Sequence, residues 1–284
     1  MPNCVVVGGS RGIGRAVALL LGELGTNVVV NGRHADMVDD TVGAITSSGG
    51  TAVGFVGAPD NERTATDLID TCRTQYGGID ALINCAGIPE PTGSSILTIT
   101  SGDFHRLIDA HLGTVFHTCR VVAPLMVRQR HGAIINTGST ASLGIYGGTG
   151  YPAGKAAVNG LTLAIAAELK HSGVRANVIC PGARTRLSEG PEYTAHLHDL
   201  HARGLLDDMT LQASLAPAPP ACVAPLYAYL AGDLSARITG QIFLAAGGFI
   251  GRFKRQTPVP LGYRDHALDP PWSMEEIDDL MGRR

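Results

Sequence analysis

A strand, a glycine-rich turn and a helix follow one another at the start of the chain, and this order constrains the fold most. Cys4–Val7 is an uninterrupted apolar run, which predicts a strand covered on both faces, since such strands show no alternation. Gly8 permits a sharp turn, Gly12 allows the backbone to approach a pyrophosphate, and Gly14 allows the helix to pack closely on the strand. The free N–H groups of the first helical turn and the positive end of the helix dipole would both face an anion bound at this turn. The stretch therefore predicts a phosphate-binding unit.

Strand-like and helix-like segments alternate through the rest of the chain. Repeated units of a strand followed by a helix imply right-handed crossovers and a parallel sheet with helices on both faces. We therefore expect an α/β fold, a doubly wound Rossmann-type parallel sheet of about seven strands. The predicted strands cover residues 4–7, 27–31, 51–56, 79–84, 133–137, 174–180 and 241–245, and the later helices cover residues 34–48, 60–76, 103–128 and 151–171.

The composition excludes several classes of protein. The chain has 284 residues, of which 44% are hydrophobic, enough for one large α/β domain. A formal net charge of -3 leaves no polybasic footprint for nucleic acid or an anionic membrane, and the apolar runs are too short to span a bilayer. The six cysteines form no Cys-x-x-Cys pair and the N-terminus has no secretion signal, so we expect a reduced, cytoplasmic protein.

Two segments interrupt the alternation. Arg184–Pro220 is long, follows a predicted strand and ends in a proline cluster, which is typical of a functional lid. Residues 251–284 begin with an extended, proline-rich stretch and end in a short helical pattern. We therefore expect one dinucleotide-binding domain over residues 1–250, with a substrate lid at about 184–220, and a C-terminal extension over residues 251–284.

The short helix of the extension has its own start signal. Ser273 and Glu276 form a capping box, in which each side chain bonds the backbone of the other residue. Trp272, the only tryptophan of the chain, directly precedes the cap. Because large aromatic side chains tend to dominate contacts, we expect Trp272 and one apolar helix face to pack against the body or a neighbouring subunit. The apolar face consists of Met274, Ile277 and Met281.

A tyrosine and a lysine lie four residues apart at the start of a predicted helix, in Tyr151-Pro-Ala-Gly-Lys155. Residues at this spacing project from the same helix face, one turn apart. A neighbouring ammonium group favours the phenolate and lowers the pKa of the tyrosine. Ser139 ends a predicted strand upstream, where its hydroxyl can donate to a developing oxyanion. The three residues predict a site that passes a proton to or from an alcohol.

Together these motifs resemble the short-chain dehydrogenase/reductase family. The resemblance extends from Cys4 to about Gly248, with the motifs in order and at family distances. It implies an enzyme that interconverts a ketone and a secondary alcohol by hydride transfer with NAD(P)(H), acting on a small-molecule substrate. The matching motifs are Gly8–Gly14, Asn84–Gly87, Ser139, Tyr151 with Lys155, and Pro181-Gly182.

The resemblance implies a role for each matching residue. Tyr151 would be the general acid/base, Lys155 would hold the nicotinamide ribose and lower the tyrosine pKa, and Ser139 would bind the substrate oxygen. Pro181–Thr185 would hold the carboxamide end of the nicotinamide. The predicted cofactor-binding residues are Gly8, Ser10, Arg11, Gly12, Ile13, Gly14, Arg33, Asn84, Ala86, Gly87, Tyr151, Lys155, Pro181, Gly182 and Thr185.

The chain departs from the family pattern at several points. The family usually has threonine where Val7 stands and a second asparagine where Cys85 stands, and both changes remove a hydrogen bond from the turn region. The spacing from Ser139 to Tyr151 is 12 residues (151 − 139), one fewer than the family spacing. Ser142 is therefore an alternative to Ser139.

His111 stands where the family has its fourth catalytic residue, an asparagine. A histidine titrates near working pH and can join a proton relay from Lys155 to solvent. Alternatively, His111 is a buried, hydrogen-bonded residue that only supports its helix. We include His111 with Ser139, Tyr151 and Lys155 in the predicted catalytic set, and the sequence leaves both interpretations open.

The sequence around His111 also resembles one branch of the family. His111–Phe116, Pro181–Arg186 and Gly247–Arg252 look like the (3R)-hydroxyacyl-CoA dehydrogenase part of multifunctional β-oxidation enzymes and its bacterial relatives. This resemblance implies a 3-oxoacyl or 3-hydroxyacyl thioester as substrate. Two other functions use the same scaffold: a dinucleotide-sensing protein without turnover, and an epimerase or dehydratase.

The end of the second predicted strand indicates the coenzyme. NAD-selective sites place an acidic residue there for the ribose 2′-hydroxyl. Here Asn31-Gly32-Arg33 holds no carboxylate, and Arg33 with Arg11 can bind the 2′-phosphate. We therefore expect NADP(H) rather than NAD(H).

The predicted lid holds three clustered histidines, His196, His198 and His201. Only the last two can share a helix face, and no cysteine lies nearby, so we expect no metal. The two long helices over residues 103–128 and 151–171 have apolar outer faces. The family resemblance makes these helices the usual subunit contacts, in a homodimer or homotetramer of closed symmetry.

Overall fold

The computed structural model describes residues 2–185, 190–254 and 257–282. Arg186 and three further residues of the predicted lid, 187–189, lie outside the described residues. The chain divides into two compact units, Met1–Phe253 and Lys254–Arg284. This boundary lies slightly beyond residue 250, because a short last strand at Phe249–Arg252 still belongs to the sheet.

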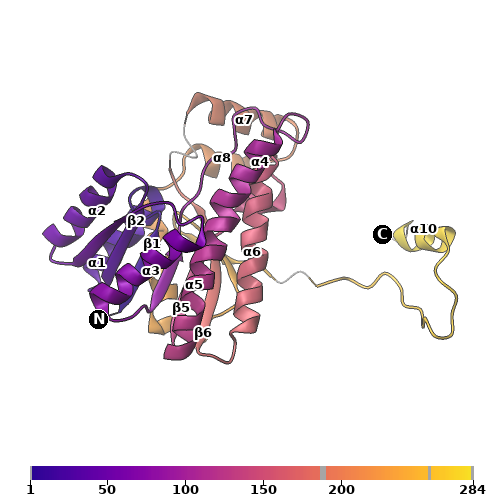
Figure 1. Ribbon diagram of the computed structural model, residues 1–284. Helices are drawn as coiled ribbons and strands as arrows, with labels where there is room; N and C mark the ends of the chain where they lie inside the picture. Colours follow the sequence, from indigo (N-terminus) through magenta and orange to yellow (C-terminus); the bar gives the residue numbers. More distant parts are fainter. Residues whose placement is uncertain (1, 186–189, 255–256, 283–284) are drawn as a thin grey trace. The chain divides into compact units, whose positions relative to one another are not determined.

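One sheet of eight strands forms the centre of the first unit, in the order β3-β2-β1-β4-β5-β6-β7-β8 (Figure 1). Every neighbouring pair up to β7 is parallel, as expected for a doubly wound fold, and β8 pairs antiparallel with β7. The sheet therefore has one strand more than predicted, a short hairpin partner at its edge. The strands are β1 (Asn3–Val7), β2 (Asn27–Gly32), β3 (Thr51–Val56), β4 (Ala81–Asn84), β5 (Gly132–Thr137), β6 (Val174–Gly182), β7 (Ile242–Ala246) and β8 (Phe249–Arg252).

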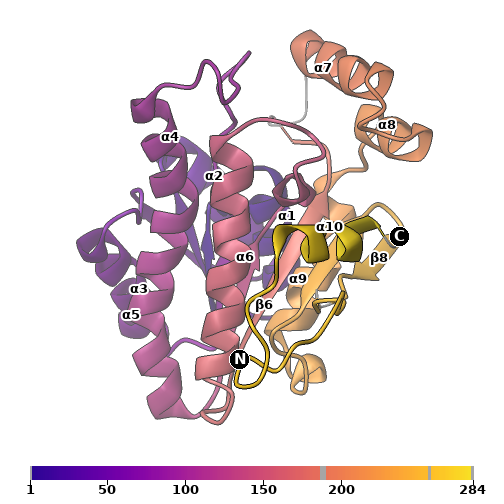
Figure 2. The ribbon, with the colours of Figure 1, turned by 90° about the vertical axis from the view of Figure 1, so that its right-hand side faces the viewer.

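Helices cover both faces of the sheet (Figures 1 and 2). Helices α1, α2 and α9 contribute to one buried cluster, and α3, α5 and α6 contribute to the other. Among the described helices, none combines the length and the apolar character that a membrane crossing needs. The helices are α1 (Gly12–Glu23), α2 (Ala35–Ser47), α3 (Glu62–Tyr76), α4 (Ser101–Ile108), α5 (Thr114–Gln129), α6 (Gly150–Glu168), α7 (Pro191–Ala202), α8 (Asp208–Leu215), α9 (Ala224–Ala231) and α10 (Met274–Gly282).

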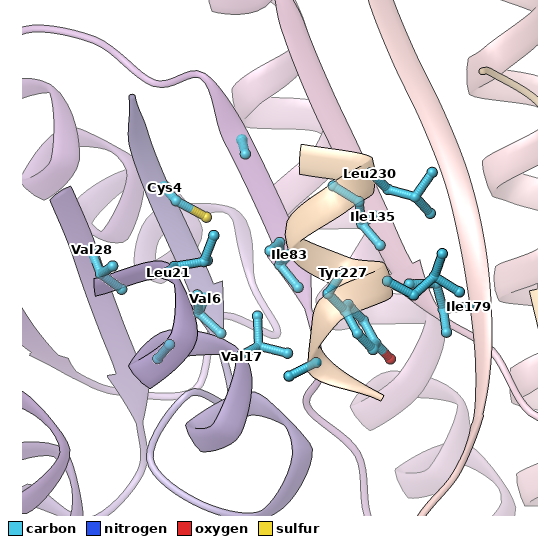
Figure 3. Packing of buried hydrophobic residues seen from close by; sticks show 14 of the residues in the cluster. Cys4, Val6, Val17, Leu21, Val28, Ile83, Ile135, Ile179, Tyr227 and Leu230 are labelled. Carbon is cyan, nitrogen blue, oxygen red and sulfur yellow. The ribbon is translucent and has the colours of Figure 1, made fainter. Parts of the chain in front are cut away.

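Successive residues of the central strands point into opposite clusters. Val6 packs with Val17 of α1, whereas its neighbours Val5 and Val7 belong to the cluster under α3 and α5. Figure 3 shows the first cluster, in which Tyr227 of α9 lies among aliphatic side chains from the strands. Full burial of such side chains contributes roughly 1.5–3 kcal/mol each. Because side chains on both faces of the strands are buried, each of these strands is a continuous apolar run in the sequence.

The helix predicted over residues 103–128 is not one regular α-helix. Between α4 and α5 the chain forms a π-helical turn, Asp109–Gly113, with His111 at its centre. A π-helical turn inserts an extra residue into the α-helical ladder and is frequent at functional sites. The apolar spacing could not reveal this, because one inserted residue leaves the periodicity on either side intact.

The predicted lid contains two helices, α7 and α8, with a small buried cluster of their own. Tyr146, in the loop after β5, forms a hydrogen bond with each of the two helices. Its backbone oxygen bonds Nε2 of His196 at 2.9 Å, and its hydroxyl bonds the hydroxyl of Ser214 at 3.2 Å. The lid is thus tied to the loop that leads from Ser139 to Tyr151.

The second unit is organised around Arg264. Its guanidinium lies 3.9 Å from the ring centroid of Trp272 and forms two hydrogen bonds with the carboxylate of Glu276, at 2.6 and 3.2 Å. The predicted capping box is present, since Glu276 N donates to Ser273 Oγ at 3.2 Å and Ser273 N donates to Glu276 Oε2 at 2.8 Å. Trp272 and α10 are therefore joined within the unit.

Candidate active site

The glycine-rich turn lies between the carboxyl end of β1 and the first turn of α1. Gly8 has φ +73°, and a Cβ there would lie 2.8 Å from Ala86 N; a Cβ at Gly14 would lie 2.2 Å from Gly8 O. Gly12 also has positive φ (+55°), but a Cβ there would meet only Thr185 Cγ2, at 3.7 Å. A side chain at Gly8 or Gly14 would therefore clash with the protein backbone, whereas there is space beside Gly12.

These features fit the pyrophosphate of a dinucleotide. Helix α1 begins directly after this turn, and the N–H groups of a first helical turn can bind an anion. The neighbours of β1 in the sheet are β2 and β4, which places the turn at the point where the strand order reverses. Ligands of doubly wound sheets bind at this point.

Ser139 and Tyr151 face each other across the loop after β5. Ser139 is the N-cap of a 3₁₀ turn, Thr140–Leu143, and its Oγ accepts a hydrogen bond from Ala141 N at 3.1 Å. The Ser139 side chain also lies close enough to that of Tyr151 to lower the pKa of the tyrosine. The alternative, Ser142, donates instead to Ser139 O at 2.7 Å and accepts from Asn159 at 3.3 Å. The geometry thus favours Ser139 over Ser142 as the partner of the tyrosine.

Lys155 lies one turn after Tyr151 on α6, as the spacing predicts. Its side chain is buried, and Nζ donates to Thr137 O at 2.8 Å. Nζ lies 5.8 Å from the centroid of the Tyr151 ring. Burial lowers the pKa of Lys155 to about 8, although Cys85 and Cys180 oppose the shift.

The pKa of Tyr151 differs from the expectation. Burial raises it, and the Ser139 side chain offsets this only in part. The Lys155 ammonium group, which was expected to lower it, donates to the Thr137 carbonyl and lies 5.8 Å from the centroid of the Tyr151 ring. Tyr151 is therefore a protonated hydroxyl at neutral pH, ready to donate.

His111 is buried next to both residues. Its ring meets the Tyr151 ring edge to face, and Nε2 bonds the Ile88 carbonyl oxygen at 3.1 Å. Since that oxygen only accepts, Nε2 carries the proton and Nδ1 is an acceptor; Nδ1 is buried with no partner among the described residues. Burial, and then the charge of Lys155, lower the pKa of His111 to about 3. The histidine is therefore neutral at working pH.

Asn84 ends β4, and its side chain is buried and hydrogen-bonded. Its amide donates to Asn136 Oδ1 at 2.8 Å, and its oxygen accepts from Thr118 Oγ1 at 3.1 Å. Asn136 in turn donates to Thr162 Oγ1 at 2.9 Å. The Asn84 side chain thus belongs to a buried network that joins β4 and β5 to α5 and α6. Asn84 remains a predicted cofactor-binding residue, and this network holds its backbone at the carboxyl end of β4.

The end of β2 has no room for an acidic side chain. A Cβ on Gly32 would lie 2.4 Å from Ser10 Oγ and 2.9 Å from Val38 Cγ2. Arg33 follows directly and is exposed, and Arg11 is partly exposed at the start of α1. The site therefore offers cations and no carboxylate where the second strand ends.

The other predicted cofactor residues lie at the carboxyl ends of the strands or beside them. Pro181 and Gly182 end β6 and pair with Ala245 and Ala246 of β7. A Cβ on Gly87 would lie 2.9 Å from the His111 ring. Ser10 is buried in the glycine turn, Ile13 packs on the core under α1, Ala86 packs on the opposite cluster, and Thr185 lies near Gly12.

Sequence reasoning missed Glu90. This residue lies in the loop between β4 and α4, and its carboxylate accepts hydrogen bonds from the backbone N–H groups of Thr149, Gly150 and Tyr151. No local pattern marks the residue, because these partners lie 59 to 61 positions away in the sequence.

The lid histidines have other partners. Besides the contact of His196 with Tyr146, Nε2 of His201 lies 2.8 Å from Asp208 Oδ1 on α8. Within the described residues, no three side chains of histidine, cysteine, aspartate or glutamate are grouped as a metal would require.

Comparison with known protein families matches residues 2–189 to the short chain dehydrogenases. A curated relative, the 3-oxoacyl-[acyl-carrier-protein] reductase of Synechocystis sp., is 35% identical over 250 residues, which cover 87% of this chain and 96% of the relative. The 3alpha-hydroxysteroid dehydrogenase of Mediterraneibacter gnavus is 32% identical over 248 residues, covering 86% of this chain and 94% of that protein.

A similar fold occurs in a solved structure of a short chain dehydrogenase from Mycobacterium avium. It has a TM-score of 0.79 and 30% identity, and covers 99% of this chain and 95% of that one. Sequence family, curated relatives and fold thus agree with the geometry of the cleft. The chain therefore belongs to the short chain dehydrogenase family, and it is an NAD(P)(H)-dependent oxidoreductase that interconverts ketones and secondary alcohols.

Proposed function

We propose that this protein is an NADP(H)-preferring reductase of 3-oxoacyl thioesters, with Ser139, Tyr151 and Lys155 as its catalytic residues. The observation that carries the proposal is the juxtaposition of the three side chains at the carboxyl end of β5. The Ser139 side chain lies beside that of Tyr151 and lowers its pKa, and Lys155, one helical turn after Tyr151, donates a hydrogen bond to Thr137 O. This arrangement matches proton transfer to a carbonyl oxygen rather than a purely structural hydrogen-bond pair.

When bound, a nicotinamide cofactor would supply the hydride for the carbonyl carbon. Ser139 donates a hydrogen bond to the carbonyl oxygen and holds it beside Tyr151. Tyr151 donates its hydroxyl proton to that oxygen as the hydride arrives, so the ketone gains one hydride and one proton. Lys155 would bind the ribose of the cofactor, and its buried ammonium group would keep a positive charge beside the tyrosine ring.

His111 takes part as a neutral acceptor in this proposal. Its Nδ1 is buried beside Gly87 and near the Lys155 ammonium group, and this atom can accept a hydrogen bond from a water molecule. Such a water would link the lysine to the helix by hydrogen bonds without any charge on the imidazole. This role replaces the relay through a titrating histidine.

The coenzyme preference rests on the end of β2. Gly32 cannot be an acidic residue without displacing Ser10, and Arg33 stands exposed next to it. A guanidinium group suits the 2′-phosphate of NADP(H), which it can bind with two parallel hydrogen bonds. The ribose 2′-hydroxyl of NAD(H) has no acidic partner at this point.

The substrate class rests on the relatives and on the sequence around His111. The Synechocystis relative is a 3-oxoacyl-[acyl-carrier-protein] reductase, and several staphylococcal relatives have the same name. The test is the oxidation of NADPH, followed at 340 nm, with a panel of 3-oxoacyl thioesters, 3-oxosteroids and simple ketones. Turnover of the thioesters supports the proposal. Turnover of the steroids alone would favour the activity named for the Mediterraneibacter relative, and binding of NADPH without any turnover would favour a sensing role.

We also propose a homodimer or homotetramer in the cytoplasm. Phe116 on α5 is 46% exposed, and Ala156, Ala164 and Ala167 on α6 are exposed as well, whereas Ala166 points inward. These residues form an apolar outer face with small side chains that permit close helix approach. All six cysteines are free, which suits a reducing compartment. A monomer by light scattering at micromolar concentration would contradict the assembly.

A further inference from the structure

The first turn of the helix that carries Tyr151 is capped by a distant carboxylate. Oε1 of Glu90 accepts from Thr149 N at 3.1 Å and from Gly150 N at 3.2 Å, and Oε2 accepts from Tyr151 N. The N-cap residue of α6, Thr149, makes no side-chain capping bond of its own. Three successive N–H groups that a helix leaves without internal partners are thus satisfied from the loop after β4.

The charge of Glu90 suits this position. Burial would raise its pKa, but the backbone donors of Tyr151, Thr149 and Gly150 outweigh that effect, so the pKa is lowered and the group stays ionised. An anion at a helix N-terminus is stabilised by the helix dipole. Ser94 donates to Oε1 at 2.9 Å and fixes the carboxylate from the other side. The cap is therefore charged and held in one orientation.

The same loop makes two further connections. Ile88 O bonds the His111 ring, and Thr92 Oγ1 donates to Glu192 Oε2 of the lid helix α7 at 3.2 Å. Ile88, Glu90 and Thr92 are alternate residues. One short segment is therefore hydrogen-bonded to the π-helical turn, to the start of α6 and to α7 of the predicted lid. Movement of this segment would displace the backbone of Tyr151.

We propose that Glu90 is a positioning residue for Tyr151, which holds the first turn of α6 so that the tyrosine hydroxyl meets Ser139 and the substrate carbonyl. The inference rests on the proposed function of Tyr151. Glu90 does not touch the reacting atoms, and its effect passes through the backbone of α6. A small displacement of a reacting group is costly, since a shift of about 1 Å can reduce turnover roughly 100-fold.

Two variants and one control test the proposal. Glu90→Ala removes the cap, whereas Glu90→Gln keeps the length of the side chain and one accepting oxygen. Asn61→Ala removes a cap from α3, where the Asn61 side chain accepts from Thr64 N at 3.0 Å; this helix contributes none of the proposed catalytic residues. The readouts are kcat and KM with a ketone that the wild type reduces, the Kd of NADPH, and hydrogen exchange of a peptide that spans residues 149–151.

Glu90→Ala is expected to lower kcat at least about tenfold with little change in KM or in the Kd of NADPH. It should also accelerate exchange in the peptide about tenfold or more. Glu90→Gln should recover a large part of kcat, and Asn61→Ala should leave both kcat and this peptide unchanged.

Wild-type kcat or unchanged exchange in Glu90→Ala overturns the proposal, as does a loss confined to KM. The proposal is also overturned if Glu90→Gln restores slow exchange in the peptide but not kcat. That result would show that capping of α6 does not determine turnover. Absence of turnover in the wild type would instead contradict the proposed function, and the exchange measurement still decides whether Glu90 fixes the first turn of α6.

Discussion

The ring of His111 meets the ring of Tyr151 at 88°, with the centroids 5.0 Å apart. This edge-to-face contact places a histidine from the π-helical turn directly against the tyrosine of α6. The preferred geometry of aromatic pairs contributes about 0.5–1.5 kcal/mol beyond burial. The contact also keeps water from one side of both rings, which is consistent with the raised pKa of Tyr151 and the lowered pKa of His111.

Tyr151→Phe should abolish most of the turnover. The substitution removes the hydroxyl that donates the proton and keeps the aromatic contact with His111, so kcat should fall about 100-fold or more. NADPH binding, measured by fluorescence titration, should persist. Tyr146→Phe is the matched control, because it removes a tyrosine hydroxyl that bonds only the lid residue Ser214 among the described residues. Near-normal turnover in Tyr151→Phe would exclude the tyrosine as the acid.

The reduction should depend on the protonation of Lys155. Burial lowers the pKa of this ammonium group to about 8, and the charged form exists below that value. The kcat/KM for reduction, which reports the free enzyme, should therefore be constant below and decrease above a pH of about 8. The measurement is a series of initial rates from pH 6 to pH 10 at constant ionic strength. A profile that stays flat to pH 10 would show that the lysine charge is not needed.

His111 should make the protein sensitive to acid. Its pKa is about 3 in the folded protein, far below the value of 6.5 for a free histidine, so the unfolded chain binds the proton more readily. The stabilisation is complete above pH 6.5 and decreases as the pH falls from there towards 3. A group of this kind contributes a slope of about 1.4 kcal/mol per pH unit in that window.

The variant His111→Asn removes this group. Its free energy of unfolding, measured with urea at pH 4, 5, 6 and 7, should vary less with pH than that of the wild type, by about that slope. The control is His105→Asn, which removes a histidine from an exposed position of α4 and leaves the buried His111 in place. Equal slopes in His111→Asn and the wild type would disprove the assignment.

Arg33→Ala should weaken NADP(H) selectively. Loss of a hydrogen bond to a charged group costs about 1.5–3 kcal/mol, so the Kd of NADPH should rise at least about tenfold. The Kd of NADH should barely change, and it serves as the internal control. Equal effects on both coenzymes would refute a contact with the 2′-phosphate.

Arg264 should hold the only tryptophan of the chain in place. Arg264→Ala removes the guanidinium that stacks on Trp272 and bonds Glu276, so acrylamide should quench the tryptophan emission more strongly. Arg264→Lys keeps the charge but not the planar stacking group, and an intermediate result is expected. Quenching equal to that of the wild type in both variants would contradict the role of Arg264.

The same fluorophore tests the predicted docking of the C-terminal extension on the body or on a neighbouring subunit. A response of the Trp272 emission to cofactor, substrate analogue or dilution supports docking. Docking is contradicted if the emission spectrum is typical of a fully exposed tryptophan and does not change with cofactor, substrate analogue or dilution.

Features that depend on neighbours within one or two turns of chain could be predicted from the sequence alone. The glycines of the first turn, the tyrosine and lysine on one helix face and the capping box of α10 are local, because backbone periodicity and steric demands of glycine act over a few residues. The order of strands and helices followed from the same periodicity. The antiparallel β8 was missed because four residues after Gly247 and Gly248 carry too little pattern to be told from a tail.

The state of each group in the site depends on contacts between segments that are far apart in the sequence. The buried network of Asn84 with Thr118 and Asn136 joins residues 34 and 52 positions apart. The capping of α6 by Glu90 spans up to 61 positions. The pKa directions of Tyr151 and His111 depend on desolvation, which exists only once distant segments exclude water. Sequence spacing identifies residues that share a local element, whereas burial and hydrogen-bond partners are properties of the assembled layers.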